Sequence, residues 1–95
     1  MDEQLVTMDR LAETVYQNCS RDHIENCVIE EMSELTKAVI KSKRGKIDID
    51  NIAEEIGHVI LMCNALMKSY CIPEEWSILE AKDAVDRMLK AKENK

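Results

Sequence analysis

The chain has 95 residues, which allows one small domain, residues 1–95, with a single modest core. Its formal net charge of −6 argues against a general nucleic-acid binder, because such a protein needs a basic face. No stretch reaches the ~18 consecutive apolar residues of a membrane span. The acidic start MDEQ is unlike a signal peptide, so we expect a cytoplasmic protein with no membrane partner. With no Phe, two Gly and one Pro, the composition is short of strand formers and turn residues and predicts an all-α fold.

The first two helices are expected over residues 3–18 and 23–44. The apolar stripe of the first consists of Leu5, Met8, Leu11, Ala12 and Val15. Ser20 then offers an N-cap and Asp22 a first-turn acid for the second helix. That helix ends near Gly45 after a basic last turn, which suits the negative end of the helix dipole. Asp48 or Asp50 can cap the next helix.

The third helix, expected over residues 51–70, is the most apolar segment. Its stripe consists of Ile52, Ile56, Val59, Ile60, Cys63, Leu66, Met67 and Tyr70. Because Leu61 and Met62 extend this stripe nearly round the helix, we expect the helix at the centre of the fold or between subunits. Pro73 is placed to start the fourth helix. The buried side of the fourth helix is expected to be Trp76, Leu79, Val85, Met88 and Leu89. Four helices with short connections predict a four-helix bundle-like fold in a helical homo-oligomer.

The four cysteines, Cys19, Cys27, Cys63 and Cys71, allow two interpretations. In a cytosolic protein they are reduced, mostly buried thiols. Alternatively, Cys19, His23 and Cys27 are spaced by four and four and would share a helix face as zinc ligands. Structural zinc sites usually use tighter pairs such as C-x2-C, so the first interpretation is the stronger.

Carboxylates border the apolar stripes of the two middle helices. In the segment VIEEMSEL, Glu31 lies three residues after Val28 and four before Leu35, on the stripe itself. A desolvated carboxylate is costly unless its charge is compensated. Glu31 with Glu34, and Glu55 with His58, each form a pair three residues apart.

Acid pairs that face each other across a bundle are how helical folds build metal sites. Carboxylate oxygens are hard ligands and favour Mg²⁺ or Mn²⁺, whose charge would cancel the cost of burial. The alternative is a solvated acidic face, which we favour for Glu30 and Glu54 because both can point outward. For Glu31, Glu34 and Glu55 that alternative must explain charges beside apolar stripes on two helices.

The middle of the chain contains the segment EEMSEL, which is followed by a basic helix end, a loop and the segment EEIGHVILM. In this order of segments it resembles the MazG-like branch of the all-α nucleoside triphosphate pyrophosphohydrolases. The pattern of that family is E-E-x-x-E on one helix and E-x-x-D on the next. Glu30, Glu31 and Glu34 match the first block, and Glu55 matches the first position of the second. His58 stands where the family has Asp. The resemblance extends over residues 24–70, and the outer helices match only as helices.

The resemblance implies hydrolysis of a nucleoside triphosphate between the α and β phosphates, giving a monophosphate and pyrophosphate. It implies that Glu31, Glu34 and Glu55 bind Mg²⁺ or Mn²⁺, with His58 in the fourth place. Glu30 or Glu34 would orient the attacking water as a base. Candidates for phosphate contacts are Lys37, Lys41, Lys82 and Arg87. The family also suggests a homodimer or homotetramer.

The replacement at His58 bears directly on the activity. A neutral imidazole offers one nitrogen and no charge, whereas Mg²⁺ prefers an anionic oxygen. The site is therefore expected to prefer another metal, to turn over slowly, or to have lost the reaction. The alternative function is a catalytically impaired nucleotide-binding protein, or a structural helical oligomer of the same fold.

Overall fold

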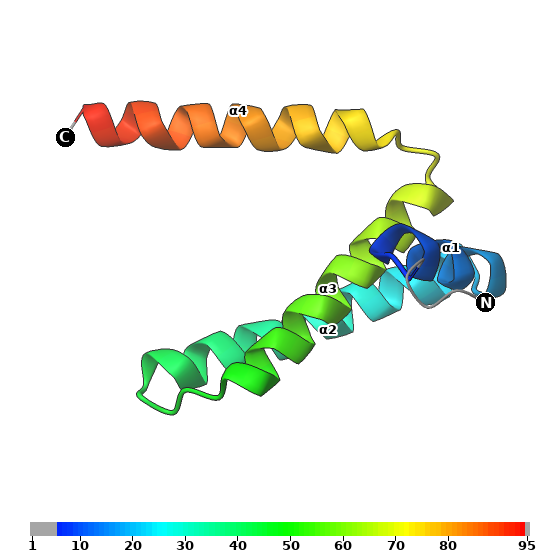
Figure 1. The fold of residues 1–95 in the computed structure, drawn as a ribbon, viewed down its shortest axis with the longest axis horizontal. Coiled ribbons are helices and arrows are strands. Elements are labelled where there is room, and N and C mark those ends of the chain that lie inside the picture. Colours follow the sequence, from blue (N-terminus) through cyan, green and yellow to red (C-terminus); the bar gives the residue numbers. More distant parts are fainter. Residues whose placement is uncertain (1–5, 95) are drawn as a thin grey trace.

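The computed structural model describes residues 6–94 of the chain and contains four helices over that range. They are α1 (Met8–Asn18), α2 (Arg21–Lys43), α3 (Ile49–Ser69) and α4 (Glu74–Glu93). The described residues form no strand, which confirms the all-α prediction. Figure 1 shows α2 and α3 as an antiparallel hairpin, with α1 against α3 at one end and α4 standing apart. None of these helices has the length and apolar character needed to cross a membrane.

Three of the helices begin at a side-chain cap that the sequence supplies. Thr7, Ser20 and Asp48 each accept a hydrogen bond from the backbone N–H three residues later, at 3.0–3.1 Å. These bonds satisfy amide groups that have no partner within the helix. Ser20 is thus confirmed as a cap, and the cap of α3 is Asp48 rather than Asp50. Gly45 follows α2 with φ +90°, a backbone conformation that a residue without Cβ adopts without strain.

Several predicted helix starts differ from the structure. α2 begins at Arg21 rather than at residue 23, and α3 begins at Ile49 rather than at residue 51. α1 begins at Met8 because the Thr7 backbone is extended and its side chain caps the helix. The predicted start at residue 3, and Leu5 of the predicted stripe, lie outside the described residues. Pro73 also has an extended backbone, so it precedes α4 as the N-cap and the helix itself starts at Glu74.

The core lies where α1, α2 and α3 meet, and it is small. Its buried residues are Ala12 from α1, Ile24 from α2, and Met62 and Ala65 from α3. Ile24 is the largest fully buried side chain among the described residues. The alanines have no exposed surface and short side chains, so the helices approach each other closely.

The buried face of α3 differs from the predicted stripe. The residues buried on α3 are Glu55, Met62, Ala65 and Ser69. Four members of the predicted stripe, Ile56, Ile60, Cys63 and Tyr70, are exposed instead. Because α3 is apolar on most of its faces, its sequence alone does not determine which face packs against α1 and α2.

Polar contacts hold both α1 and α2 to the C-terminal end of α3. Arg21 donates a hydrogen bond to the Ser69 carbonyl at 2.7 Å, and its guanidinium lies 4.4 Å from the centre of the Tyr70 ring. The Tyr70 hydroxyl donates to Glu25, which raises the pKa of Tyr70.

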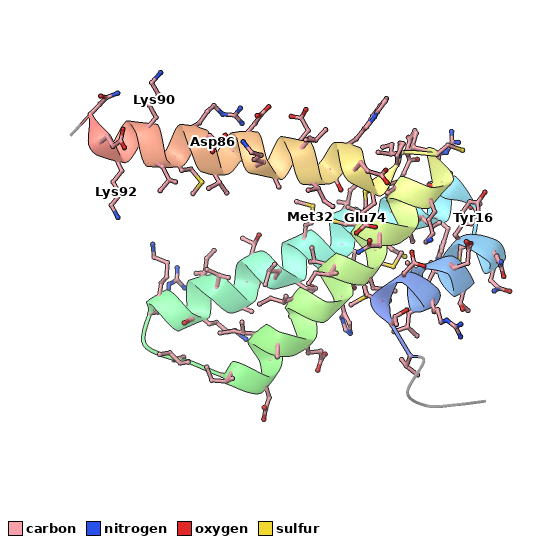
Figure 2. All side chains as sticks on the ribbon, turned by 45° about the horizontal axis from the view of Figure 1, so that its top comes forward. Tyr16, Met32, Glu74, Asp86, Lys90 and Lys92 are labelled. Atoms are coloured by element: carbon pink, nitrogen blue, oxygen red, sulfur yellow. The ribbon has the colours of Figure 1, made fainter. Side chains whose placement is uncertain are left out.

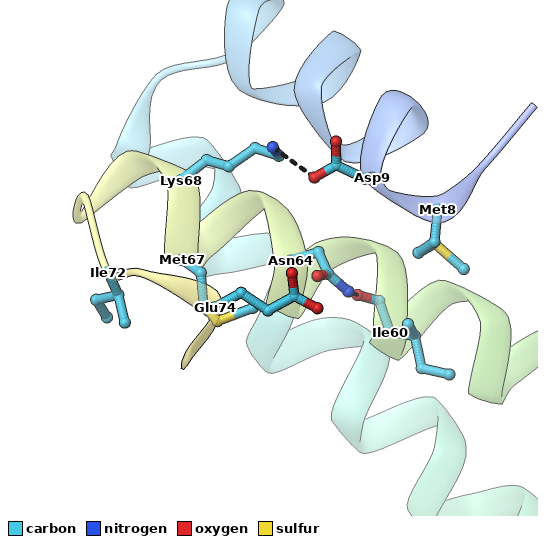
Figure 3. A pocket seen from close by; sticks show the side chains of 8 residues that line it. All are labelled: Met8, Asp9, Ile60, Asn64, Met67, Lys68, Ile72 and Glu74. Carbon is cyan, nitrogen blue, oxygen red and sulfur yellow. Dashed lines mark hydrogen bonds and ion pairs between the residues drawn. The ribbon is translucent and has the colours of Figure 1, made fainter. Parts of the chain in front are cut away.

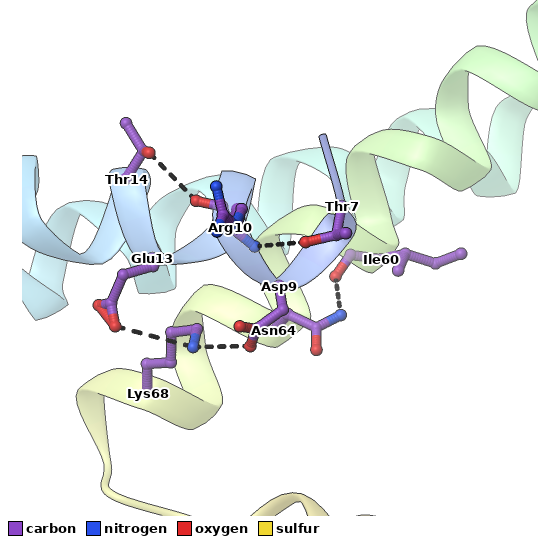
Figure 4. Close-up of polar contacts among 8 residues, drawn as sticks. All are labelled: Thr7, Asp9, Arg10, Glu13, Thr14, Ile60, Asn64 and Lys68. Carbon is purple, nitrogen blue, oxygen red and sulfur yellow. Dashed lines mark hydrogen bonds and ion pairs between the residues drawn. The ribbon is translucent and has the colours of Figure 1, made fainter. Parts of the chain in front are cut away.

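A lysine of α3 makes the corresponding contact with α1. Lys68 lies 2.9 Å from an oxygen of Asp9 and 3.8 Å from one of Glu13 (Figure 4). The hydrogen bond to Asp9 raises the pKa of Lys68. Because both contacts involve partly exposed groups, we attribute the orientation of α1 to them and its stability mainly to the apolar core.

The fourth helix does not pack as the sequence predicts. Its expected buried side chains, Trp76, Leu79, Val85, Met88 and Leu89, are between 52% and 70% exposed. Figure 2 shows the side chains of α4, with Asp86, Lys90 and Lys92 labelled, projecting with no other helix beside them along most of its length. The radius of gyration is 16.0 Å, against roughly 12 Å for a compact domain of this length. Within one chain the bundle therefore consists of three helices.

Candidate metal centre

Two carboxylates and an imidazole meet where α2 passes α3. Glu31 comes from α2, and Glu55 and His58 come from successive turns of α3. One potential ligand atom from each lies within 4.8 Å of the other two. His58 Nδ1 is 2.7 Å from Glu31 Oε2 and 3.5 Å from Glu55 Oε1. The structure thus brings together three of the residues that the sequence singles out.

The site lies at the edge of the core, with its acids inside and its imidazole at the surface. The side chain of Glu55 is 9% exposed, that of Glu31 20%, and that of His58 48%. Oε2 of Glu31 is fully buried and accepts no hydrogen bond. His58 Nδ1 is 2.7 Å from this oxygen, an ion-pair distance when the imidazole is protonated, although no hydrogen bond joins the two atoms.

A buried carboxylate oxygen without a donor costs about 1–3 kcal/mol or more, since water would have bonded it in the unfolded chain. A cation beside it removes that cost. The available donors, two carboxylates and one imidazole nitrogen on two helices, fit a divalent ion and leave further coordination positions for water or a ligand. The residues present therefore fit the metal that the sequence pattern implies.

A hollow opens beside these groups. Its volume is about 230 Å³, and its lining consists of Cys27, Glu31, His58, Leu61 and Met62. Its lining is mostly apolar and includes the side chains of Glu31 and His58. Low-dielectric surroundings of this kind strengthen the attraction between an ion and its ligands.

Glu34 is the predicted ligand that the structure leaves outside the group. It lies one turn after Glu31 on α2, where its carboxylate pairs with Lys37 at 3.3 Å near the surface. Glu30 and Glu54 are exposed, in agreement with the outward orientation expected for them.

The predicted phosphate-contacting residues are not gathered at the centre within one chain. Lys37 is paired with Glu34, and Lys41 is exposed near the end of α2. Lys82 and Arg87 belong to α4, and Lys82 pairs there with Asp86 at 2.9 Å. Because α4 stands apart from the hairpin, those two would reach a ligand only in a different arrangement of α4 or across a subunit interface.

The sequence predicts that Cys27 is a reduced thiol without a ligand, or a zinc ligand together with Cys19 and His23, and neither prediction places Cys27 beside Glu31 and His58. Its position four residues before Glu31 on α2 is the signal that could have done so. The Cys27 Sγ lies 3.5 Å from His23 Nε2. Cys19, His23 and Cys27 do not form a three-ligand group of the kind that Glu31, Glu55 and His58 form among the described residues. Burial, with the nearby Glu30, Cys19 and Glu31, raises the pKa of the Cys27 thiol.

A larger hollow of about 330 Å³ lies on a different face of α3 (Figure 3). Three of its polar side chains, Asp9, Asn64 and Lys68, are already engaged with protein groups. Lys68 is paired with Asp9, and the Asn64 amide donates to the Ile60 carbonyl at 2.8 Å (Figure 4). Although this hollow is larger than the one beside His58, the side chains of Lys68 and Asn64 in it are already bonded to protein groups and so are not free to bind a ligand.

Comparison of the chain with family models, with curated proteins and with solved structures gives no match. Evidence for a function therefore comes from the residue pattern and from the geometry of the centre.

Proposed function

We propose that this chain is a metal-dependent nucleoside triphosphate pyrophosphohydrolase of the MazG-like kind. The observation that carries the proposal is the meeting of Glu31, Glu55 and His58 around a buried carboxylate oxygen that accepts no hydrogen bond. The reaction is inferred from the resemblance of the two acidic blocks to the MazG-like pattern. The proposal is supported by the approach of Glu31 on α2 to Glu55 and His58 on α3. Mg²⁺ or Mn²⁺ is the proposed ion, and the substrate is a nucleoside triphosphate.

Water cleaves the anhydride bond between the α and β phosphates, and pyrophosphate leaves as the second product. A divalent ion held by Glu31, Glu55 and His58 would neutralise phosphate charge and lower the pKa of the attacking water. Neutralisation matters here because the chain carries a net charge of −6 and repels a polyphosphate. The resemblance assigns the general base to Glu30 or Glu34, both of which lie outside the group of Glu31, Glu55 and His58, so a proton transfer from that water to either carboxylate requires a side-chain movement.

We further propose that the chain works as a homodimer or homotetramer formed through α4. The apolar residues of α4 are exposed, and so are Ile29 and Met32 on α2 and Ile56 and Ile60 on α3. Helices in proteins owe most of their stability to packing of an apolar face, and large exposed apolar patches mark interaction surfaces. A second copy carries both the α4 stripe and the surfaces that would cover it.

Sedimentation tests this assembly. Leu79→Lys with Val85→Lys should convert the oligomer to a monomer, whereas Asp83→Lys, on the side of α4 opposite Val85, should change the mass little. A stable monomer of the native chain at micromolar concentration would contradict the proposed assembly.

Pyrophosphate release from a panel of nucleoside triphosphates, with Mg²⁺, Mn²⁺ or Co²⁺, tests the reaction. Glu55→Gln should reduce the rate by at least about 100-fold, because a lost ligand should cost no less than a second-shell partner. Glu54→Gln is the matched control, since it makes the same chemical change at the exposed neighbouring residue. Failure of every triphosphate with every metal would exclude the enzyme.

One contact favours a second candidate, a nucleotide-binding or structural module without catalysis. A protonated His58, 2.7 Å from Glu31 Oε2, would compensate the buried acid without any metal. Calorimetry separates the possibilities in an inactive protein, since a nucleotide-binding module would still bind a triphosphate and a structural one would not.

A further inference from the structure

A thiol lies beside the metal centre and has no part in the proposed reaction. Cys27 precedes Glu31 by four residues on α2, so the two side chains lie one turn apart on the same helix face. Cys27 also helps to line the hollow of about 230 Å³ into which Glu31 and His58 face. Its sulfur is therefore on the wall of the same space as the carboxylate and the imidazole.

The buried oxygen of Glu31 favours a cation at the centre beside which this hollow lies. That oxygen is inaccessible to water and accepts no hydrogen bond, although an imidazole nitrogen is 2.7 Å away. The hollow's remaining lining, Leu61 and Met62, contributes apolar surface and a weak thioether acceptor. Cys27 is thus the lining residue, besides Glu31 and His58, that can offer a strong metal ligand.

We propose that Cys27 is a further ligand of this centre, which consequently binds Zn²⁺ or Co²⁺ more tightly than the Mg²⁺ of the proposed reaction. The proposal rests on the metal centre of the proposed function. Thiolate with imidazole and carboxylate is a ligand set that zinc takes in tetrahedral geometry. Mg²⁺ demands octahedral oxygen coordination and has little affinity for sulfur. The imidazole at position 58 and the thiol at position 27 thus both shift the metal preference of the site away from Mg²⁺ and toward Zn²⁺ or Co²⁺.

Binding requires a small rearrangement at Cys27. Its sulfur now lies 3.5 Å from His23 Nε2 and is outside the group of ligand atoms that Glu31, Glu55 and His58 form. Rotation about χ1, the single heavy-atom torsion of a cysteine side chain, moves the sulfur between staggered positions. As the metal–sulfur bond forms, the thiol proton is released to solvent, with the His23 nitrogen beside it as an acceptor on the way.

Titration with Co²⁺ tests the proposal, because thiolate coordination gives a sulfur-to-cobalt charge-transfer absorption that nitrogen and oxygen ligands do not give. The titration uses the full chain with Cys63→Ser and Cys71→Ser, which removes the two exposed thiols. We expect the absorption in this background, its loss in Cys27→Ser, and its retention in Cys19→Ser. Zn²⁺ affinity should fall by more than about tenfold in Cys27→Ser, since losing even a second-shell partner costs that much.

Further variants separate this proposal from the proposed function. Co²⁺ binding that needs Glu31 and His58 but gives no thiolate absorption would overturn the role of Cys27 and leave the metal centre intact. Failure of Co²⁺, Zn²⁺ and Mg²⁺ to bind at all would overturn both. An absorption that survives Glu31→Gln and His58→Ala but disappears in Cys19→Ser would place the metal at the cysteines and also overturn the proposal.

Because Cys27 packs against the core, Cys27→Ala accompanies Cys27→Ser, and far-ultraviolet circular dichroism checks that both variants fold. The alanine variant keeps an apolar side chain against the core while removing the sulfur. Loss of the absorption in a folded alanine variant supports the proposal as well as loss in the serine variant does, and its persistence there overturns it.

Discussion

α3 and α4 are of nearly equal length, 21 and 20 residues, and both carry large apolar side chains, yet they have opposite surroundings. α3 packs against α1 and α2 and buries residues on one face. α4 buries none of its residues within the chain. α3 buries Ala65 and Ser69 where its neighbours approach, whereas α4, which also contains alanines, leaves Trp76 and Met88 exposed.

The comparison teaches that an apolar stripe predicts a helix more securely than it predicts the partner of that helix. It also separates two kinds of cost. The packed hairpin contains a buried carboxylate oxygen without a hydrogen bond, and α4 carries exposed apolar surface, and each of these lowers the stability of the chain.

Alanine substitutions should give the largest contrast between the two regions. Ile24→Ala is expected to lower the free energy of unfolding by about 2–5 kcal/mol, because it leaves a cavity in the core. Leu79→Ala on α4 should change it by no more than about 0.5 kcal/mol in a monomer, as for other surface positions. Urea unfolding at several protein concentrations checks both values. If α4 packs in an oligomer, the cost of Leu79→Ala should grow with protein concentration, whereas that of Ile24→Ala should exceed it at every dilution.

The next largest effect is expected from adding a divalent ion, which should stabilise the folded chain if the ion binds beside Glu31. A divalent ion at 100 times its dissociation constant should raise the stability of the native chain by about 2.7 kcal/mol. Glu31→Gln should abolish that gain and leave the metal-free fold intact or more stable, because it removes the uncompensated buried charge. Melting temperatures with and without metal measure the effect. Glu54→Gln, which alters an exposed acid, should retain the gain, and an equal gain in Glu31→Gln would refute the metal centre.

A smaller effect is expected when His58 is changed to Asp. The substitution supplies an anionic oxygen, so Mg²⁺ should bind about tenfold more tightly, which corresponds to about 1.4 kcal/mol. Without metal the variant should be less stable than the native chain, since its new charge repels Glu55 and a smaller side chain leaves space. Calorimetric titration with Mg²⁺ and with Mn²⁺ gives the two affinities. Unchanged or weaker Mg²⁺ binding would mean that position 58 is not a ligand.

The smallest expected effect concerns the contact that holds α2 to α3. The hydrogen bond to Glu25 raises the pKa of Tyr70 above its ordinary value of 10.0, so the protonated tyrosine is the form that stabilises the fold. That contribution is complete below about pH 10 and is lost as the pH rises through the folded-state value. Tyr70→Phe should therefore lower the urea midpoint slightly at neutral pH, and this difference should vanish at alkaline pH. Tyr16→Phe, an exposed change on α1, should show no such trend.

Much of the local structure was determined by the sequence alone. Ser20 caps α2 and Asp48 caps α3 because their side chains accept bonds from amides that have no other partner. The same is true of part of the site. The position of Glu31 between Val28 and Leu35 predicted a desolvated acid, whose side chain is 20% exposed in the structure, and the pairing of Glu55 with His58 predicted a second group on α3.

Tertiary structure decided which faces meet. Periodicity left several faces of α3 equivalent, and close packing selected the one with Glu55 and Ala65, so Ile56 is exposed. Packing also decided that Glu31 meets both groups of α3 while Glu34, a turn away, pairs with Lys37. The position of α4 depended entirely on tertiary packing. Helix formation is governed by neighbours along the chain, whereas helix docking depends on surfaces that other segments, or other copies of the chain, supply.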